Sequence, residues 1–243
     1  MESNKTVAFM GASGGVGLAT LKKTLAAGYQ CTALCRTPST LTDILPTESN
    51  PNLRVLKGNA HDITTVSQLI RKDDGNLVDT IVSTIGAKPT LSMKMFDDMA
   101  TVCQKGMSTL LEAIDQLRKS GAQGKPHIIV CGTTGMSRFG RDIPLAQVPL
   151  YKVLLATPHA DKTVMEDTLT ESGEEFTIVR CGWLLNGERD RPIRVGIEDP
   201  KKGVEVKEIG YAISREDAGN WFAEQLVIKK DPKYSNKVAS IVY

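Results

Sequence analysis

The chain has 243 residues, of which 41% are hydrophobic and 24% charged, and its formal net charge is +2. This is the composition of an ordinary globular domain, and the basic residues are scattered among acidic ones, which argues against a nucleic-acid surface. No apolar run approaches the ~20 residues of a membrane helix, and the N-terminus lacks the features of a signal peptide, so we expect a cytoplasmic protein with no membrane partner.

Cysteine and histidine are too sparse to suggest a metal centre. With only three histidines and no paired cysteine spacing, no metal site is predicted. Buried free thiols in a reducing compartment fit the odd number of cysteines best. The five cysteines are Cys31, Cys35, Cys103, Cys131 and Cys181.

Short apolar runs alternate along the chain with segments that have helical spacing. Strands are predicted at 6–11, 30–36, 53–58, 78–85, 127–132, 176–181 and 237–242. Helices are predicted at 16–27, 62–71, 93–120 with a break near Gly106, 161–172 and 215–229. Asp62 and Ser214 are the expected N-caps of two of them. Because no tight hairpin joins the strands, we predict one α/β domain over residues 1–243. Its expected core is a Rossmann-type, doubly wound parallel sheet with helices on both faces.

Three segments do not fit this alternation. The stretch 37–52 contains three prolines and is predicted to be loop with at most one short helix. The stretch 134–158 is rich in glycine and proline and is predicted to be a long loop, which in a compact domain is usually functional. The polar, glycine-rich segment 182–211 is expected to hold short strands at best and to form a small lobe over the sheet edge. The last two segments suit a substrate lid.

The first strand runs directly into a glycine-rich turn that opens the first helix. Its residues are Gly11, Ala12, Ser13, Gly14, Gly15, Val16 and Gly17. Gly11 permits a tight exit from the strand, Gly14 or Gly15 lets backbone N–H groups approach a diphosphate, and Gly17 lets the helix pack closely on the sheet. The helix N-terminus attracts the phosphates, and Ser13 can donate a further hydrogen bond. A turn without a ligand can have the same sequence, but the place of this one in the first βα unit favours a dinucleotide site.

The end of the second strand indicates which dinucleotide is bound. NAD-binding proteins usually place a carboxylate there for the ribose hydroxyls, whereas this chain has Arg36, Thr37 and Ser39 and no acid before Asp43. Arg36 offers a planar, charged fork for a 2′-phosphate, and the two hydroxyls can add donors. An arginine here can also be solvated or stack on adenine, but the missing carboxylate favours NADP(H).

Two further strand ends are expected to line the cofactor. Asn59 and Ala60 follow the third strand, where Asn59 can reach the adenine edge. Ile85 and Gly86 follow the fourth strand, where a small residue lets the ribose pass. Plain turn chemistry explains each pair equally well.

Several of these features together resemble the atypical short-chain dehydrogenase/reductases, and within them the NmrA-like NAD(P)-binding proteins, many of which are fungal. The resemblance rests on GASGGVG after the first strand, Arg36 after the second, DKTVMEDTLTESGEEFTIVRCGWL, and ISREDAGNWFAEQLV near the C-terminus. It covers most of the chain, and its more specific part is 158–184. It implies a Rossmann-type sheet and NADP(H) binding, in a branch that holds both reductases and non-catalytic redox sensors.

The chain departs from the family at the Tyr-x-x-x-Lys pair, in which a tyrosine donates the proton and a lysine holds the ribose. Tyr151 is followed at once by Lys152, and position 155 is leucine. The resemblance places Lys162 at the ribose lysine. His159, one turn earlier on the same helical face, can serve as the acid or can simply be a helix-start residue.

Other residues near this position have weaker claims to a catalytic part. Thr133 and Thr134 can hold a substrate carbonyl or only cap the loop after the fifth strand. Tyr151 can swing in from the long loop. Cys181 stands where the branch usually has proline and is interpreted as a packing residue.

These residues fit three functions. The favoured one is an NADPH-dependent oxidoreductase that reduces a carbonyl or enone of a small-molecule substrate. The second, suggested by the missing tyrosine–lysine pair, is a non-catalytic NADP(H) sensor that binds a partner protein. The third is a redox-neutral isomerisation or cyclisation in a biosynthetic pathway.

Overall fold

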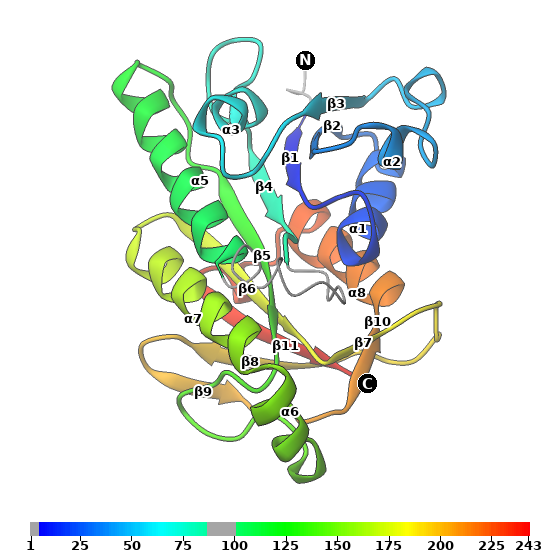
Figure 1. The fold of residues 1–243 in the computed structure, drawn as a ribbon, viewed down its shortest axis with the longest axis vertical. Helices are drawn as coiled ribbons and strands as arrows, with labels where there is room; N and C mark the ends of the chain where they lie inside the picture. Colours follow the sequence, from blue (N-terminus) through cyan, green and yellow to red (C-terminus); the bar gives the residue numbers. More distant parts are fainter. Residues whose placement is uncertain (1–4, 87–100) are drawn as a thin grey trace.

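The computed structural model describes residues 5–86 and 101–243, and its centre is a nine-stranded sheet in the order β3-β2-β1-β4-β5-β6-β11-β8-β9 (Figure 1). The first seven of these strands run parallel to their neighbours. In the order of the sheet they are β3 (Leu53–Lys57), β2 (Gln30–Cys35), β1 (Thr6–Met10), β4 (Thr80–Ser83), β5 (His127–Thr133), β6 (Glu175–Cys181) and β11 (Lys237–Val242). The predicted Rossmann-type architecture is confirmed.

Helices cover both faces of the sheet because side chains alternate along each buried strand. In β1, Val7 and Phe9 belong to one apolar core, and Ala8 and Met10 belong to the other. The first core is covered by α1 (Gly15–Ala26), α8 (Arg215–Trp221) and the π-helical turn η4 (Phe222–Ile228), and the second by α3 (Ile63–Ile70), α5 (Val102–Lys119) and α7 (Ala156–Glu171) (Figure 1).

Both predicted N-caps are present. The carboxylate of Asp62 accepts hydrogen bonds from the N–H groups of Thr64 and Thr65, each at 3.3 Å. The Ser214 hydroxyl accepts one from the Asp217 N–H at 2.9 Å. Such caps satisfy N–H groups that have no acceptor within the helix, and each contributes about 1 kcal/mol.

The predicted loop 134–158 is wrong in its second half. The chain forms a 3-10 turn, η3 (Leu145–Gln147), and then the helix α6 (Val148–Leu154). The next helix, α7, begins at Ala156 rather than at Asp161. Two prolines suggested a loop, but Pro149 and Pro158 occupy the first turns of their helices, where an N–H has no intrahelical acceptor to lose.

The segment 182–211 also differs from the prediction. β8 (Arg194–Asp199) and β9 (Gly203–Val206) extend the main sheet as an antiparallel hairpin. A separate two-stranded parallel sheet consists of β7 (Trp183–Leu185) and β10 (Ala212–Ser214). The sequence contains a signal for this hairpin, because Asp and Pro at 199–200 favour a turn. In the structure the Asp199 carboxylate accepts hydrogen bonds from the N–H groups of Lys201 and Lys202, both at 2.9 Å.

Three smaller details complete the fold. The predicted break near Gly106 is wrong, since α5 is continuous there and a Cβ on Gly106 would lie 2.3 Å from Ile85 Cδ1. Most of the earlier part of that predicted helix lies outside the described residues. The stretch 37–52 holds α2 (Ser39–Thr42) and the 3-10 turn η1 (Thr47–Ser49), and another 3-10 turn, η5 (Pro232–Tyr234), precedes β11.

Neither a membrane span nor a metal-binding cluster is found in the ranges 5–86 and 101–243. No helix there combines the length and the apolarity needed to cross a bilayer. No three or more His, Cys, Asp or Glu side chains within those ranges lie together in a way that could hold a metal ion.

Candidate functional site

The strand order places a ligand site at the carboxyl ends of the central strands. β1 lies between β2 and β4, so the chain leaves β1 toward one edge of the sheet and later returns on the other side. In doubly wound sheets this switch point leaves a crevice in which ligands bind. The glycine turn, which connects β1 to α1, lies at this position (Figure 1).

Two of the glycines are required by packing against Thr84 and Ile85, which directly follow β4. Gly11 has a φ of +93°, and a Cβ there would lie 2.8 Å from the backbone nitrogen of Ile85. A Cβ on Gly17 would lie 2.3 Å from Thr84 Oγ1. The same Thr84 hydroxyl donates a hydrogen bond to the Gly11 carbonyl at 3.1 Å. These contacts hold the turn in one conformation against the end of the neighbouring strand.

The middle of the turn is open. A Cβ on Gly14 would meet no heavy atom of residues 5–86 or 101–243 within 4 Å. The Leu18 N–H donates to the Gly14 carbonyl at 3.3 Å, which leaves the N–H groups of residues 15–17 without acceptors within the helix, and no side chain caps α1. Ser13 is half-buried beside them, whereas Val16 is buried in the core and only positions the turn. An uncapped helix start with free space in front of it fits a diphosphate.

The residues predicted for the adenosine end lie at the ends of β2 and β3. Arg36, Thr37 and Ser39 are exposed, and Arg36 forms no ion pair with any residue the structure describes. Asn59 is exposed, but its side-chain oxygen accepts a hydrogen bond from the His61 N–H at 3.2 Å. That bond gives Asn59 a part in the turn itself.

The remaining cofactor candidates are positioned mainly by packing. Ala60 packs against the core beneath α3, and Ile85 packs against that core and contacts Gly106. Gly86 is exposed, and a Cβ there would meet no atom of the described part of the chain within 4 Å. Ile85 therefore borders the glycine turn at Gly11, and Gly86 follows it in the chain.

Lys162 and Thr133 lie together at the carboxyl end of β5. The Lys162 ammonium donates hydrogen bonds to Thr133 Oγ1 at 3.0 Å and to the Cys131 carbonyl at 3.2 Å. Thr134, by contrast, is buried, and its hydroxyl donates to the Cys181 carbonyl at 3.4 Å. Thr134 thus fixes β5 to β6, and Thr133 is the one of the two that adjoins the lysine.

Tyr151 and His159 also lie together, although the sequence placed Tyr151 on a mobile loop. Tyr151 is on α6 and only 3% exposed, and its ring packs against the His159 ring with the centroids 5.7 Å apart. Gly135 makes room for both, since a Cβ there would lie 2.8 Å from Tyr151 Cδ1 and 3.1 Å from His159 Cε1. Tyr151 is therefore fixed by packing and does not need to swing in.

The polar atoms of this pair have no partners. Tyr151 Oη and His159 Nε2 are buried and form no hydrogen bond with any described residue. Burial raises the pKa of Tyr151, whereas burial and the charge of Lys162 lower the pKa of His159. Both side chains are therefore neutral at about pH 7. Leaving such a group unpaired costs about 1–3 kcal/mol, so the pair is a candidate for contact with a ligand.

A cavity of about 410 Å³ adjoins these two side chains. Gly135, Ile143, Val148 and Ala156 contribute to its walls together with Tyr151 and His159. Its polar lining includes Ser137, Arg141, Asp142 and Lys152. A concave site of this size that combines apolar walls with charged and polar side chains can accept a small organic molecule that carries polar groups.

A buried charge network, which the sequence analysis missed, lies next to this cavity. Arg180 on β6 forms ion pairs with Glu166 on α7 at 2.7 Å and with Glu198 on β8 at 3.1 Å. The Ser137 hydroxyl donates a hydrogen bond to the second oxygen of Glu198. Gly132 leaves space for the network, since a Cβ there would lie 2.7 Å from Glu166 Oε1. The available signal was an arginine within the apolar run FTIVRC.

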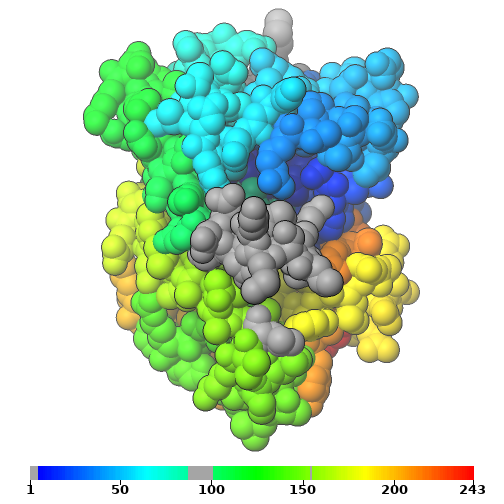
Figure 2. All heavy atoms as spheres, viewed as in Figure 1, coloured from blue at the N-terminus to red at the C-terminus, as the bar shows by residue number. Residues whose placement is uncertain are grey.

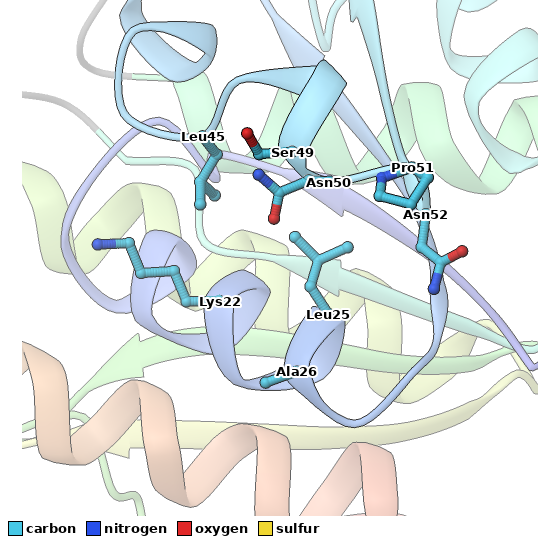
Figure 3. A pocket seen from close by; sticks show the side chains of 8 residues that line it. All are labelled: Lys22, Leu25, Ala26, Leu45, Ser49, Asn50, Pro51 and Asn52. Carbon is cyan, nitrogen blue, oxygen red and sulfur yellow. The ribbon is translucent and has the colours of Figure 1, made fainter.

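A second cavity, of about 290 Å³, lies between α1 and the segment 45–52 (Figure 3). Its lining includes Lys22, Leu25 and Ala26 from the last turns of α1, and Asn50 and Asn52 from the facing segment. The rise of a helix places Lys22 roughly 10 Å along the axis from Gly15, so this cavity is at the opposite end of α1 from the glycine turn.

Comparison with known proteins gives one family and two curated relatives from Aspergillus. The NAD(P)H-binding family model matches residues 11–228. The reductase pytE of Aspergillus terreus is 38% identical, and the match covers 100% of both chains. The oxidase pynE of Aspergillus niger is 31% identical over 93% of this chain and 94% of its own.

Solved structures with low sequence identity share the fold. A wide-type short-chain dehydrogenase/reductase from Veillonella parvula, in complex with NADP, has a TM-score of 0.75 at 14% identity and covers 98% of this chain and 94% of its own. The anaerobilin reductase ChuY of Escherichia coli O157:H7 has a TM-score of 0.68 at 20% identity, with 98% and 97% covered.

Proposed function

Because the chain belongs to the NAD(P)H-binding family, in the NmrA-like branch of the atypical short-chain dehydrogenase/reductases, we propose that it uses NADPH to reduce a carbonyl or enone of a small organic substrate. The observation that carries the proposal is the cavity lined by Tyr151 and His159. Each of these two residues has a buried polar atom without a partner among the described residues, and His159 lies one helical turn before Lys162 on α7.

The glycine turn is the proposed binding site of the cofactor diphosphate. Its free N–H groups and the open space at Gly14 fit that group, while Gly11 and Gly17 hold the turn rigid. The choice of NADP(H) over NAD(H) is supported by Arg36, which is exposed at the end of β2 without an ion-pair partner among the described residues. Thr37 and Ser39 can add hydroxyl donors to the same phosphate.

Lys162 and Thr133 form the proposed link between the cofactor and the substrate. Lys162 is held by Thr133 and by the Cys131 carbonyl, and an ammonium group with three donors can still hold a ribose hydroxyl. Thr133 in turn can orient a substrate oxygen at the end of β5. When bound, the reduced nicotinamide supplies the hydride.

Tyr151 is the proposed proton donor. Its raised pKa keeps the phenol protonated, so the hydroxyl can polarise a substrate carbonyl and pass its proton to the oxygen as the carbon is reduced. The phenolate left behind is disfavoured by burial and must regain a proton. The His159 ring packs against the phenol ring, and a neutral imidazole can accept a proton from solvent on one nitrogen while its other N–H donates, so His159 is the proposed relay for that proton.

The test is turnover by the purified protein. NADPH consumption is followed with small aldehydes, ketones, quinones and enones, and NADP⁺ reduction is followed with the corresponding alcohols, because one relative is a reductase and the other an oxidase. We expect turnover in at least one direction, with NADPH preferred over NADH. Tight NADPH binding without turnover in either direction would overturn the proposal and favour a sensor. Product formation that continues without NADPH would favour a redox-neutral reaction.

A further inference from the structure

The first residue of α8 lies beside the glycine turn. A Cβ on Gly15 would be 3.4 Å from Arg215 Cδ and 3.8 Å from Arg215 Nε. Farther along the two helices, a Cβ on Gly219 would be 2.4 Å from Ala19 Cβ. α1 and α8 are therefore parallel neighbours whose N-termini lie at the same end, as Figure 1 also shows.

Arg215 also reaches the segment that follows β6. Its guanidinium Nη1 donates hydrogen bonds to Asn186 Oδ1 at 2.6 Å and to the Leu184 carbonyl at 3.1 Å. The side chain thus spans from the glycine turn to β7 and the residue after it. The exposed residues that continue from Asn186, through 192, form the yellow edge of the face seen in Figure 2.

None of the described carboxylates forms an ion pair with Arg215, although Glu216 and Asp217 follow it in the first turn of α8. The side chain is half-buried, and both of its hydrogen-bond acceptors are neutral; it forms no ion pair with a residue of 5–86 or 101–243. The carboxylate of nearby Asp217 is engaged by the Tyr243 hydroxyl and by the Arg189 N–H at 3.1 Å. A half-buried cation beside the uncapped N-terminus of α1 creates a positive potential that an anion would relieve.

From this geometry we propose that Arg215 binds the cofactor diphosphate from the α8 side, opposite the backbone N–H groups of the glycine turn. This inference rests on the proposed function, because it takes a dinucleotide on that turn as its premise. A guanidinium held at one edge by Asn186 and Leu184 still offers further N–H donors for phosphate oxygens, and such charge-assisted bonds are strong. Arg215 would also connect a bound cofactor to the segment 184–186.

The test compares ligands with and without a diphosphate. Dissociation constants are measured for NADPH, 2′-phospho-ADP-ribose and adenosine 2′-monophosphate in the wild type, Arg215→Gln, Arg215→Lys and Asn186→Ala. Arg54→Gln, which removes an exposed charge from β3, is the matched control. We expect Arg215→Gln to weaken the two diphosphate ligands about tenfold or more, with a smaller loss in the other two variants. Adenosine 2′-monophosphate should bind all five proteins equally.

Three outcomes would overturn the proposal. If Arg215→Gln lowers the melting temperature but leaves the NADPH constant within about twofold of the wild type, the arginine only links α8 to β7. If it weakens adenosine 2′-monophosphate as much as NADPH, the effect is not on the diphosphate. If the wild type binds neither diphosphate ligand, the proposed function itself fails, and that result is distinct from the first two.

Discussion

The proposed cofactor-binding region (the cofactor side) and the proposed substrate-binding region (the substrate side) use different parts of the chain, one its backbone and the other its side chains. The cofactor side is backbone: seven consecutive residues, 11–17, lie where β1 ends and α1 begins, and two of their glycines pack on the residues that directly follow β4. The substrate side is side chains: Thr133, Tyr151, His159 and Lys162 come from a strand and two helices and meet only through tertiary packing. The comparison suggests that a backbone site can be recognised from local sequence, whereas a side-chain cavity needs the packed fold.

The largest effect should come from breaking the buried network beneath the substrate side. Arg180→Met leaves Glu166 and Glu198 buried without their cation, and we expect a loss of about 3–5 kcal/mol in the free energy of unfolding at about pH 7. Burial already raises the pKa of Glu166, so the carboxyls bind protons more readily in the folded variant, and the defect should shrink as the pH falls. Urea unfolding at several pH values measures both.

The matched control for that variant is Arg138→Met. Arg138 pairs with Asp167 at 2.5 Å, but both side chains are largely exposed, so we expect a change of less than about 1 kcal/mol. An equal effect of the two substitutions would mean that the burial of the Arg180 network does not matter for stability.

Tyr151→Phe should separate activity from stability on the substrate side. Without the proposed proton donor, kcat should fall about 100-fold. The free energy of unfolding should stay constant or rise by about 1 kcal/mol, because the variant removes a buried hydroxyl that has no partner. Turnover and thermal melts test this, with exposed Tyr211→Phe as the control. An unchanged kcat would exclude Tyr151 as the donor.

Two glycine substitutions on the cofactor side should affect different properties, one the stability of the fold and the other the affinity for NADPH. Gly17→Ala places a Cβ against Thr84 and should destabilise the fold by about 2 kcal/mol. The methyl group of Gly14→Ala would contact none of the residues that the structure describes, so the fold should stay intact. NADPH binding should weaken, because the methyl group occupies the space proposed for the diphosphate. If Gly14→Ala binds NADPH as well as the wild type does, the diphosphate does not lie there.

Arg36→Ala should change cofactor choice without changing stability. The side chain is exposed and unpaired among described residues, so its loss should leave the melting temperature constant. We expect the preference for NADPH over NADH to fall about tenfold, the effect of losing one charge-assisted phosphate contact. The ratio of the two dissociation constants is the measurement, and an unchanged ratio would place the 2′-phosphate elsewhere.

The pH profile of kcat should show the smallest effect. Because burial raises the pKa of Tyr151 above 10.0, the phenol stays protonated and kcat should not decline between about pH 7 and pH 9. Because burial and Lys162 lower the pKa of His159 below 6.5, any acid limb from this residue should lie below that pH and vanish in His159→Gln. An alkaline limb near pH 9 that disappears in Tyr151→Phe would contradict this assignment.

The sequence predicted the parts of the fold that depend on local signals. The glycine turn and the caps at Asp62 and Ser214 were identified because each is encoded within a few consecutive residues. The helix α6 was missed because Pro149 lies in its first turn, where proline is tolerated but resembles a loop signal. The sequence therefore predicts a loop at Tyr151, where the structure has a helix.

Two charged residues were missed for a different reason. Arg215 lies next to Gly15 only because α1 and α8 pack side by side, with two hundred residues of chain between the two positions (Figure 1). Arg180 finds its partners Glu166 and Glu198 on a helix and on an added strand. Such contacts follow from strand order and helix packing, and no local pattern in the chain encodes them.

The most direct test of the account is a crystal structure of the complex with NADP⁺. We predict that the diphosphate lies on the N–H groups at the start of α1, that the nicotinamide ribose contacts Lys162, and that the nicotinamide ring faces the cavity containing Tyr151 and His159. A nicotinamide ring turned away from that cavity, or a dinucleotide bound at the far end of α1, would contradict the claim that the two sides form one oxidoreductase site.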